Sequence, residues 1–281
     1  ELTELLAGLP NSGNALLIGV TGPPGVGKST TTGALISEYR NQGLRVAVLA
    51  VDPSSPVTGG ALLGDRIRMQ EHALDEGVFI RSMSSRGQLG GLSSATLAAT
   101  RVLDAVGFDV IIVETVGVGQ SEVDVVNTVD TVVLVLAPGA GDGVQAAKAG
   151  ILEIADVYVV NKADRDGAEG VVRELRSMIG LGSAASNSWV PEIVTTVATT
   201  GQGLADLVLA ISKHHEWAVS SGDRAVRSVE RARLNLRRAV LNSVNELLDE
   251  NVTTLNSLSS RVASGELSTE LAVQQILQDL S

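Results

Sequence analysis

The sequence predicts an α/β fold in which a doubly wound, mostly parallel sheet of about seven strands is followed by a helical arm. Seven short apolar segments recur along residues 15–198, and most are continuous rather than alternating, as in strands covered on both faces. Helical patterns lie between them, and after about residue 222 the strand patterns stop. We therefore divide the chain into an N-terminal helical remnant (1–14), a sheet domain (15–221) and a C-terminal helical arm (222–281).

The individual elements follow from these patterns. The helix expected over 28–43 ends at Gly43, a residue that often terminates helices, and further helices are expected over 94–107 and 204–218. The seven predicted strands are 15–20, 45–51, 78–82, 109–114, 131–137, 156–161 and 193–198.

Composition excludes several classes of protein. The chain of 281 residues is 44% hydrophobic but only 2% aromatic, so its core must consist of Ala, Val, Leu and Ile, which favours buried parallel strands. A formal net charge of −11 argues against a nucleic-acid partner, which requires a basic face. The absence of cysteine excludes disulfides and thiolate metal sites.

Hydropathy gives no sign of a membrane protein. The longest apolar runs, such as 131–137, are far shorter than the roughly 20 residues that a membrane span needs. No signal-peptide pattern is visible. We expect a cytoplasmic protein with no membrane partner.

The helical arm carries a seven-residue apolar repeat. Gly265 ends this pattern, and a final helix is expected over 268–280 with Ser268 as its cap. The arm either packs back on its own domain or packs against a second subunit; the length of the repeat favours a homodimer. The repeat consists of Leu234, Leu241, Leu248, Leu255 and Val262, with Val244 and Leu258 in a companion row that Arg237 and Asn251 interrupt.

The first predicted strand leads directly into a glycine-rich phosphate cradle. The sequence 22-GPPGVGKST-30 satisfies G-x-x-x-x-G-K-[ST] in full and opens a predicted helix, whose N-terminus also attracts anions. The lysine would reach the β- and γ-phosphates, and the serine hydroxyl would ligate Mg²⁺. This is a nucleoside-triphosphate site whose candidate residues are Gly22, Pro23, Pro24, Gly25, Val26, Gly27, Lys28, Ser29 and Thr30.

A second motif indicates which base is bound. The strand 156–161 ends in 161-NKAD-164, where Asp164 can accept two hydrogen bonds from guanine that adenine cannot offer. Asn161 would tie this loop to the phosphate cradle, and the Lys162 stem would cover the base. The last strand leads to Val197, Ala198 and Thr199, where the Ala198 N–H would reach the base carbonyl; Val197 replaces the Ser usual in GTPases.

Two acidic residues follow apolar strands and are candidates for the metal site. Asp52 closes one strand, although an Asp-Pro pair at a strand end is also ordinary turn chemistry. Glu114 begins a variant of the Asp-x-x-Gly switch motif in 114-ETVGVGQSE-122. Val118 follows the motif's glycine, Gly117, and Gln120 comes two positions later than a glutamine is usual.

Together these motifs resemble the MeaB/MMAA/ArgK family, which belongs to the signal-recognition-particle/MinD/BioD class of P-loop GTPases. The resemblance rests on 51-VDPSSPVTGGALLGDRIRM-69, 114-ETVGVGQSE-122 and 137-APGAGDGVQAAKAG-150 and covers about 15–220. It implies a G-protein chaperone of adenosylcobalamin-dependent methylmalonyl-CoA mutase that uses GTP/GDP and Mg²⁺. It also implies that the arm is a dimerisation arm.

The resemblance also implies roles for individual residues. Ser29, Asp52, Asp65 and Glu114 would surround Mg²⁺ and its waters, and Lys28, Asp65 and Glu114 would serve catalysis. Because Val118 cannot orient water as a side-chain amide does, we expect slow GTP hydrolysis that a partner completes.

By the same resemblance, the glycine-rich loop over 138–150 is an additional switch loop, although a plain flexible connection remains an alternative. The candidate switch and partner residues are Gln120, Asp142, Gln145 and Lys148, and Arg86 in another loop is a candidate phosphate or partner contact.

Two other functions remain open: a P-loop kinase or ATPase linked to amino-acid transport, and a protein-targeting GTPase. The guanine motif disfavours the first, and the presence of only three Met residues disfavours the second. The histidines, residues 72, 214 and 215, lack metal-ligand spacing, and the adjacent pair is expected on a solvated helix surface.

Overall fold

The computed structural model describes residues 8–9, 14–52, 72, 74–84, 94–115, 125, 128–139, 149–181 and 188–279. The predicted N-terminal remnant thus lies almost wholly outside the described residues. The chain consists of two compact units, Glu1–Arg231 and Ala232–Ser281. The division falls beyond the boundary at 221/222 that composition suggests, because the following helix begins with arginines that bind aspartates of the sheet unit.

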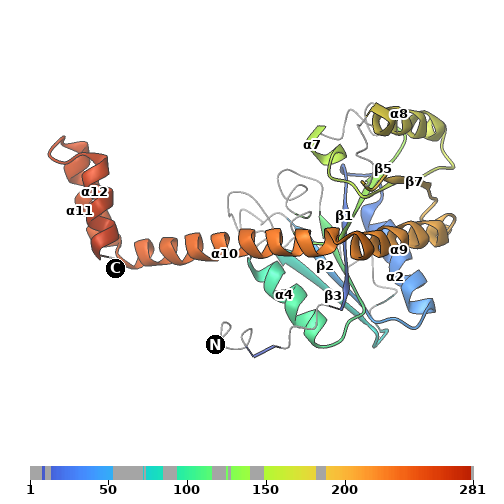
Figure 1. The fold of residues 1–281 in the computed structure, drawn as a ribbon, viewed down its shortest axis with the longest axis horizontal. Helices are drawn as coiled ribbons and strands as arrows, with labels where there is room; N and C mark the ends of the chain where they lie inside the picture. The colour runs from blue at the N-terminus through green and yellow to red at the C-terminus, as the bar shows by residue number, and fades with distance from the viewer. Residues whose placement is uncertain are drawn as a thin grey trace. The chain divides into compact units, whose positions relative to one another are not determined.

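The first unit contains a seven-stranded sheet in which every neighbouring pair of strands is parallel (Figure 1). The strand order is β3-β2-β4-β1-β5-β6-β7: the chain runs from β1 to β2 and β3, returns to place β4 between β2 and β1, and then continues on the other side of β1 through β5, β6 and β7. This confirms the doubly wound parallel sheet, with each strand close to its predicted place. The strands are β1 (Leu16–Thr21), β2 (Val46–Asp52), β3 (Val78–Ser84), β4 (Val110–Thr115), β5 (Thr131–Leu136), β6 (Val157–Val160) and β7 (Glu192–Thr195).

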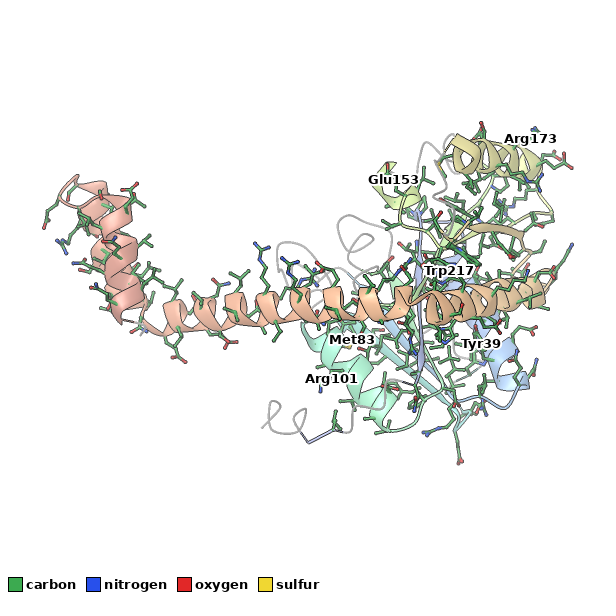
Figure 2. The ribbon with its side chains drawn as sticks, in the orientation of Figure 1. Tyr39, Met83, Arg101, Glu153, Arg173 and Trp217 are labelled. Atoms are coloured by element: carbon green, nitrogen blue, oxygen red, sulfur yellow. The ribbon has the colours of Figure 1, made fainter. Side chains whose placement is uncertain are left out.

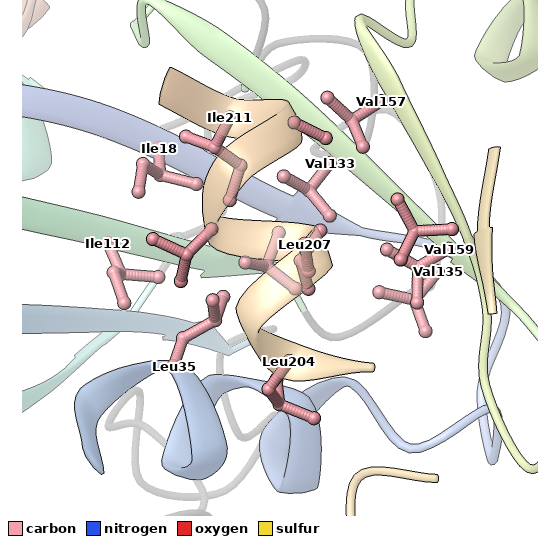
Figure 3. Packing of buried hydrophobic residues seen from close by; sticks show 14 of the residues in the cluster. Ile18, Leu35, Ile112, Val133, Val135, Val157, Val159, Leu204, Leu207 and Ile211 are labelled. Carbon is pink, nitrogen blue, oxygen red and sulfur yellow. The ribbon is translucent and has the colours of Figure 1, made fainter. Parts of the chain in front are cut away.

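Helices cover both faces of this sheet. On one face, Leu35 of α2 and Leu207 of α9 pack against Ile18 and Val133 in the largest apolar cluster (Figure 3). On the other face, α4 and α8 belong to separate clusters. This two-sided burial explains why β4 and β5 are apolar almost throughout. The helices of this unit are α2 (Lys28–Asn41), α4 (Ser94–Ala105), α7 (Ala149–Leu152), α8 (Ala168–Leu181) and α9 (Leu204–Ser221).

Gly43 ends α2 as predicted. Its φ of 80° is in the left-handed region, and its N–H donates to the Arg40 carbonyl over 2.9 Å.

Charged residues fasten the following helix, α10 (Asp223–Glu250), to the sheet. Arg227 donates two hydrogen bonds of 3.1 Å to Asp156, which precedes β6. Arg231 donates a 2.8 Å bond to Asp130, which precedes β5. Both aspartates are buried, so these arginines supply the charge partners that their burial requires.

His214 corrects the prediction that the histidine pair is solvated. Its side chain is 0% exposed, and its ring lies between Thr131 Oγ1 at 2.8 Å and Asp156 Oδ1 at 3.2 Å. Burial alone would raise the pKa of Asp156, but His214 and Arg227 hold that pKa below its usual value. The sequence could not show this because the partners, Thr131 and Asp156, lie far from His214 along the chain.

The second unit contains the rest of α10 together with α11 (Val252–Ala263) and α12 (Thr269–Asp279). A break at Asn251 separates α10 from α11, so no single helix carries the predicted seven-residue repeat. Leu258 of α11 and Ala272 of α12 are buried where these two helices contact each other. Ser268 caps α12 as predicted, since its hydroxyl accepts a 3.3 Å bond from the Leu271 N–H.

None of the helices that the structure describes is both long enough and apolar enough to cross a bilayer.

Candidate functional site

The phosphate cradle lies between β1 and α2, and its glycines are required by geometry. Gly22, Gly25 and Gly27 have φ values of 141°, 78° and 99°. A Cβ on Gly22 would lie 2.1 Å from the Val135 carbonyl oxygen, and one on Gly27 would lie 2.4 Å from Asn161 Nδ2. The loop can therefore curl tightly against β5 and the base motif only with glycine at these positions.

Lys28 is held across this loop. Its side chain is buried, and its Nζ donates hydrogen bonds of 2.8 Å and 2.9 Å to the carbonyls of Gly22 and Pro23. The ammonium thus stays at the centre of the cradle, where phosphate oxygens of a nucleotide would approach it.

Ser29 and Glu114 meet beside the cradle. The Ser29 hydroxyl donates a 2.6 Å hydrogen bond to Glu114 Oε1, and both side chains are buried. The parallel pairing of β1 with β4 places Val20 opposite Glu114 and so brings the end of β4 next to the start of the loop. The predicted switch glutamate and the predicted metal-binding serine are therefore neighbours.

These groups fit a magnesium ion. A serine hydroxyl and a carboxylate are hard oxygen donors, and Mg²⁺ takes few protein ligands beside waters and phosphates. The backbone of Asp52 ends β2, and the preceding residue, Val51, pairs with Thr115, which follows Glu114. Across the part of the chain that the structure describes, no group of three or more His, Cys, Asp or Glu side chains forms a further metal site.

Asn161 joins three loops in one hydrogen-bond network. Its Nδ2 donates to the Val26 carbonyl over 2.9 Å, which ties the base motif to the phosphate cradle. Its Oδ1 accepts bonds from the Ala198 N–H at 3.1 Å and the Thr196 hydroxyl at 3.2 Å. With the side chain only 2% exposed, all of these bonds are shielded from water. The predicted link between the two motifs is confirmed.

Lys162 forms a second bridge. Its φ of 57° is unusual for a residue with a side chain, and its Nζ donates a 2.7 Å bond to the Gly25 carbonyl. The aliphatic stem therefore spans from the base motif to the cradle and forms one wall of a cavity of about 120 Å³. The cavity is lined by Gly27, Thr30, Asn161, Lys162, Asp164, Arg165, Val197, Ala198 and Thr199.

This lining brings together the predicted phosphate, base and carbonyl-binding segments, but one predicted donor already has a partner. Because the Ala198 N–H donates to Asn161 Oδ1, a base carbonyl would have to share or displace that bond. Val197 is also used locally, since its N–H donates to the Gln202 carbonyl at 3.0 Å.

Sequence reasoning missed two residues of this site. Thr196, the first residue of 196-TVATTG-201, helps to orient Asn161, and Arg165 lines the cavity directly after the NKAD motif. Several predicted residues lie outside the described part of the chain: Asp65, Arg86, Val118, Gln120, Asp142, Gln145 and Lys148. Of Asp52 only the backbone is described.

The fold and this site define a P-loop nucleoside triphosphatase with a guanine-type base motif. Residues 2–253 match the family model described as methylmalonyl Co-A mutase-associated GTPase MeaB. The chain belongs to the MeaB family, and it is a GTPase.

Similar proteins agree with this assignment. A putative GTPase of Pyrococcus horikoshii is 49% identical over 96% of this chain and 86% of its own length. GTPase ArgK of Escherichia coli is 40% identical over 97% of this chain and 87% of its own length. Among solved structures, an LAO/AO transport system kinase is 30% identical with a TM-score of 0.70, covering 99% of this chain and 86% of that one.

Proposed function

We propose that this GTPase binds GTP with Mg²⁺ and uses slow hydrolysis to gate cofactor loading and protection of an adenosylcobalamin-dependent methylmalonyl-CoA mutase. The mutase partner is supported by the name of the family, whose model describes a methylmalonyl Co-A mutase-associated GTPase. The observation that carries the nucleotide site is the buried Asn161, which holds the phosphate cradle and both base-binding loops together.

The predicted site residues have distinct tasks in this proposal. Lys28 would contact the β- and γ-phosphates, and Asp164 would accept the guanine N1–H and N2 amine. Ser29 and Glu114 would hold Mg²⁺ or its waters together with Asp52 and Asp65. The ion would neutralise charge that develops on the phosphates during transfer.

Control of hydrolysis would come from the partner. Val118 offers no amide to orient water, so the isolated protein should turn over slowly. Gln120, Asp142, Gln145 and Lys148 would sense the nucleotide and contact the mutase.

A homodimer through the C-terminal helices is part of the same proposal. Exposed apolar side chains on α10 and α12 support it, because isolated apolar stripes are commonly covered by a partner. They include Leu241, Leu271 and Leu277.

The test is GTP turnover with and without purified mutase. We expect turnover well below one per second alone and a stimulation of about tenfold or more with mutase, because a partner that completes the site raises the rate of hydrolysis. Lys148→Glu should reduce the stimulation more than it reduces GTP affinity. Lys213→Glu, which reverses charge at an exposed residue of α9 paired with Glu192, should leave both unchanged. Turnover of tens per second without mutase would refute control by a partner.

One observation favours a second candidate function. The similar solved structure is described as a transport system kinase, which would pass the γ-phosphate to an acceptor rather than to water. Labelled phosphate found on a protein acceptor, together with equal competition by ATP and GTP, would support the kinase. Release of all label as inorganic phosphate, with GTP preferred over ATP, would support the GTPase.

A further inference from the structure

Two long side chains line the nucleotide cavity, and among the described residues only one of them has a hydrogen-bond partner. Lys162 is fixed by its bond to the Gly25 carbonyl. Arg165 lines the same cavity, yet its guanidinium forms no ion pair or side-chain hydrogen bond with any residue that the structure describes. Several other arginines of the first unit, such as Arg40, Arg227 and Arg231, are paired with aspartates.

The backbone holds Arg165 firmly at this place. Its N–H donates to the Lys162 carbonyl over 3.0 Å, and its carbonyl accepts a 3.4 Å bond from the Ala168 N–H at the start of α8. The turn is therefore fixed at both ends while the side chain remains exposed beside the cavity. A fixed backbone reduces the entropy that the side chain loses when it covers a ligand.

We propose that the Arg165 guanidinium stacks on the face of the guanine base opposite to the Lys162 stem. The inference rests on the proposed guanine-nucleotide site and adds a residue to it. A planar base between the two motifs has two faces, and the Lys162 stem forms one wall. Arg165 is the other long side chain in the lining, and a planar guanidinium stacks well on aromatic rings.

This position predicts a specific dependence on the ligand. The phosphates would lie on the cradle around Lys28, whereas Arg165 belongs to the turn that follows the base motif. The contribution of Arg165 should therefore be the same for GMP, GDP and GTP. It should also leave the preference for guanine over adenine to Asp164, because stacking does not distinguish purines by their hydrogen-bonding groups.

The experiment compares equilibrium dissociation constants of wild type, Arg165→Ala, Arg165→Lys and the control Arg173→Ala for GDP and GTP. Arg173 projects from α8, where it forms an ion pair with the exposed Glu169 at 3.7 Å (Figure 2). Its replacement by alanine removes one positive charge, as Arg165→Ala does, but at a residue that does not line the cavity. We expect Arg165→Ala to raise both constants by the same factor of about five. Arg165→Lys should bind both nucleotides almost as weakly as Arg165→Ala, because the lysine ammonium is not planar and cannot stack on the base as a guanidinium does.

Several outcomes would overturn the proposal. They are unchanged affinity in Arg165→Ala, full recovery in Arg165→Lys, an equal loss in Arg173→Ala, or a loss that grows from GDP to GTP, which would indicate a phosphate contact. Failure of the wild-type protein to bind GDP would instead refute the underlying nucleotide site. The two failures are therefore distinguishable in one titration series.

Discussion

Replacing Asn161 by alanine tests whether one buried amide holds the nucleotide site together. The side chain makes three hydrogen bonds, to the Val26 carbonyl, the Ala198 N–H and the Thr196 hydroxyl. All three partners belong to buried residues, so water cannot easily replace the lost amide. The variant should therefore be destabilised even in the absence of nucleotide.

The structure allows the size of this effect to be estimated. A typical intramolecular hydrogen bond contributes about 1 kcal/mol net, so the loss of three should lower the free energy of unfolding by about 3 kcal/mol. Thr196→Val keeps the side-chain shape but removes only the 3.2 Å bond to Asn161, and it should cost about 1 kcal/mol. Because the two substitutions remove the same contact, the double variant should lose less free energy of unfolding than the sum of the two single losses.

Urea denaturation with and without GDP measures both consequences. GDP at about one hundred times its dissociation constant should stabilise the wild type by about 2.7 kcal/mol. The same GDP concentration should stabilise Asn161→Ala much less, because the cradle and the base loops are no longer linked. If Asn161→Ala were as stable as Thr196→Val, or were stabilised by GDP as fully as the wild type, the assigned role of Asn161 would be wrong.

Two further predictions concern specificity and pH. Asp164→Asn should weaken GDP binding and favour xanthosine diphosphate, because an amide can donate to the xanthine 2-carbonyl where the carboxylate could only accept; competition titration measures this, and an unchanged preference for guanine would contradict it. The pKa of Asp156 is lowered in the folded protein from its usual 3.8, so its ion pairs stabilise the fold above pH 3.8 and this contribution is lost as pH falls through the lower folded value. Urea denaturation of wild type and Asp156→Asn between pH 3 and pH 7 should therefore show a difference that shrinks in acid, and a constant difference would contradict it.

Local patterns predicted the sheet well because each strand carries its own signal. The continuous apolar segments predicted all seven strands, and the motifs 22-GPPGVGKST-30 and 161-NKAD-164 predicted two loops that the structure brings to one cavity. The prediction failed where long-range partners decide the outcome. His214 has a polar local context, but its ring lies against Thr131 and Asp156, which belong to other parts of the chain. A second failure is local: the helix breaks at Asn251, although the apolar repeat continues on both sides of it.

Arg165 was missed for a related reason. An arginine after a base motif carries no signal by itself, and its relevance depends on the cavity that residues 197–199 complete from another part of the chain. Asp65 and the switch candidates remain predictions, because their roles depend on residues outside the described structure.

A single short strand, β6, connects two buried polar clusters of the sheet unit. Asp156 precedes it and binds Arg227 of α10, while Asn161 follows it and binds the phosphate cradle. All residues of β6 are buried between β5 and β7, so the strand cannot bend freely. We therefore expect a nucleotide that repositions Asn161 to change the free energy of the ion pair between Asp156 and Arg227 as well. Such coupling predicts weakened GDP binding in Arg227→Ala, although Arg227 is not among the residues that line the cavity. Affinity equal to that of the wild type would show that the two ends of β6 act independently.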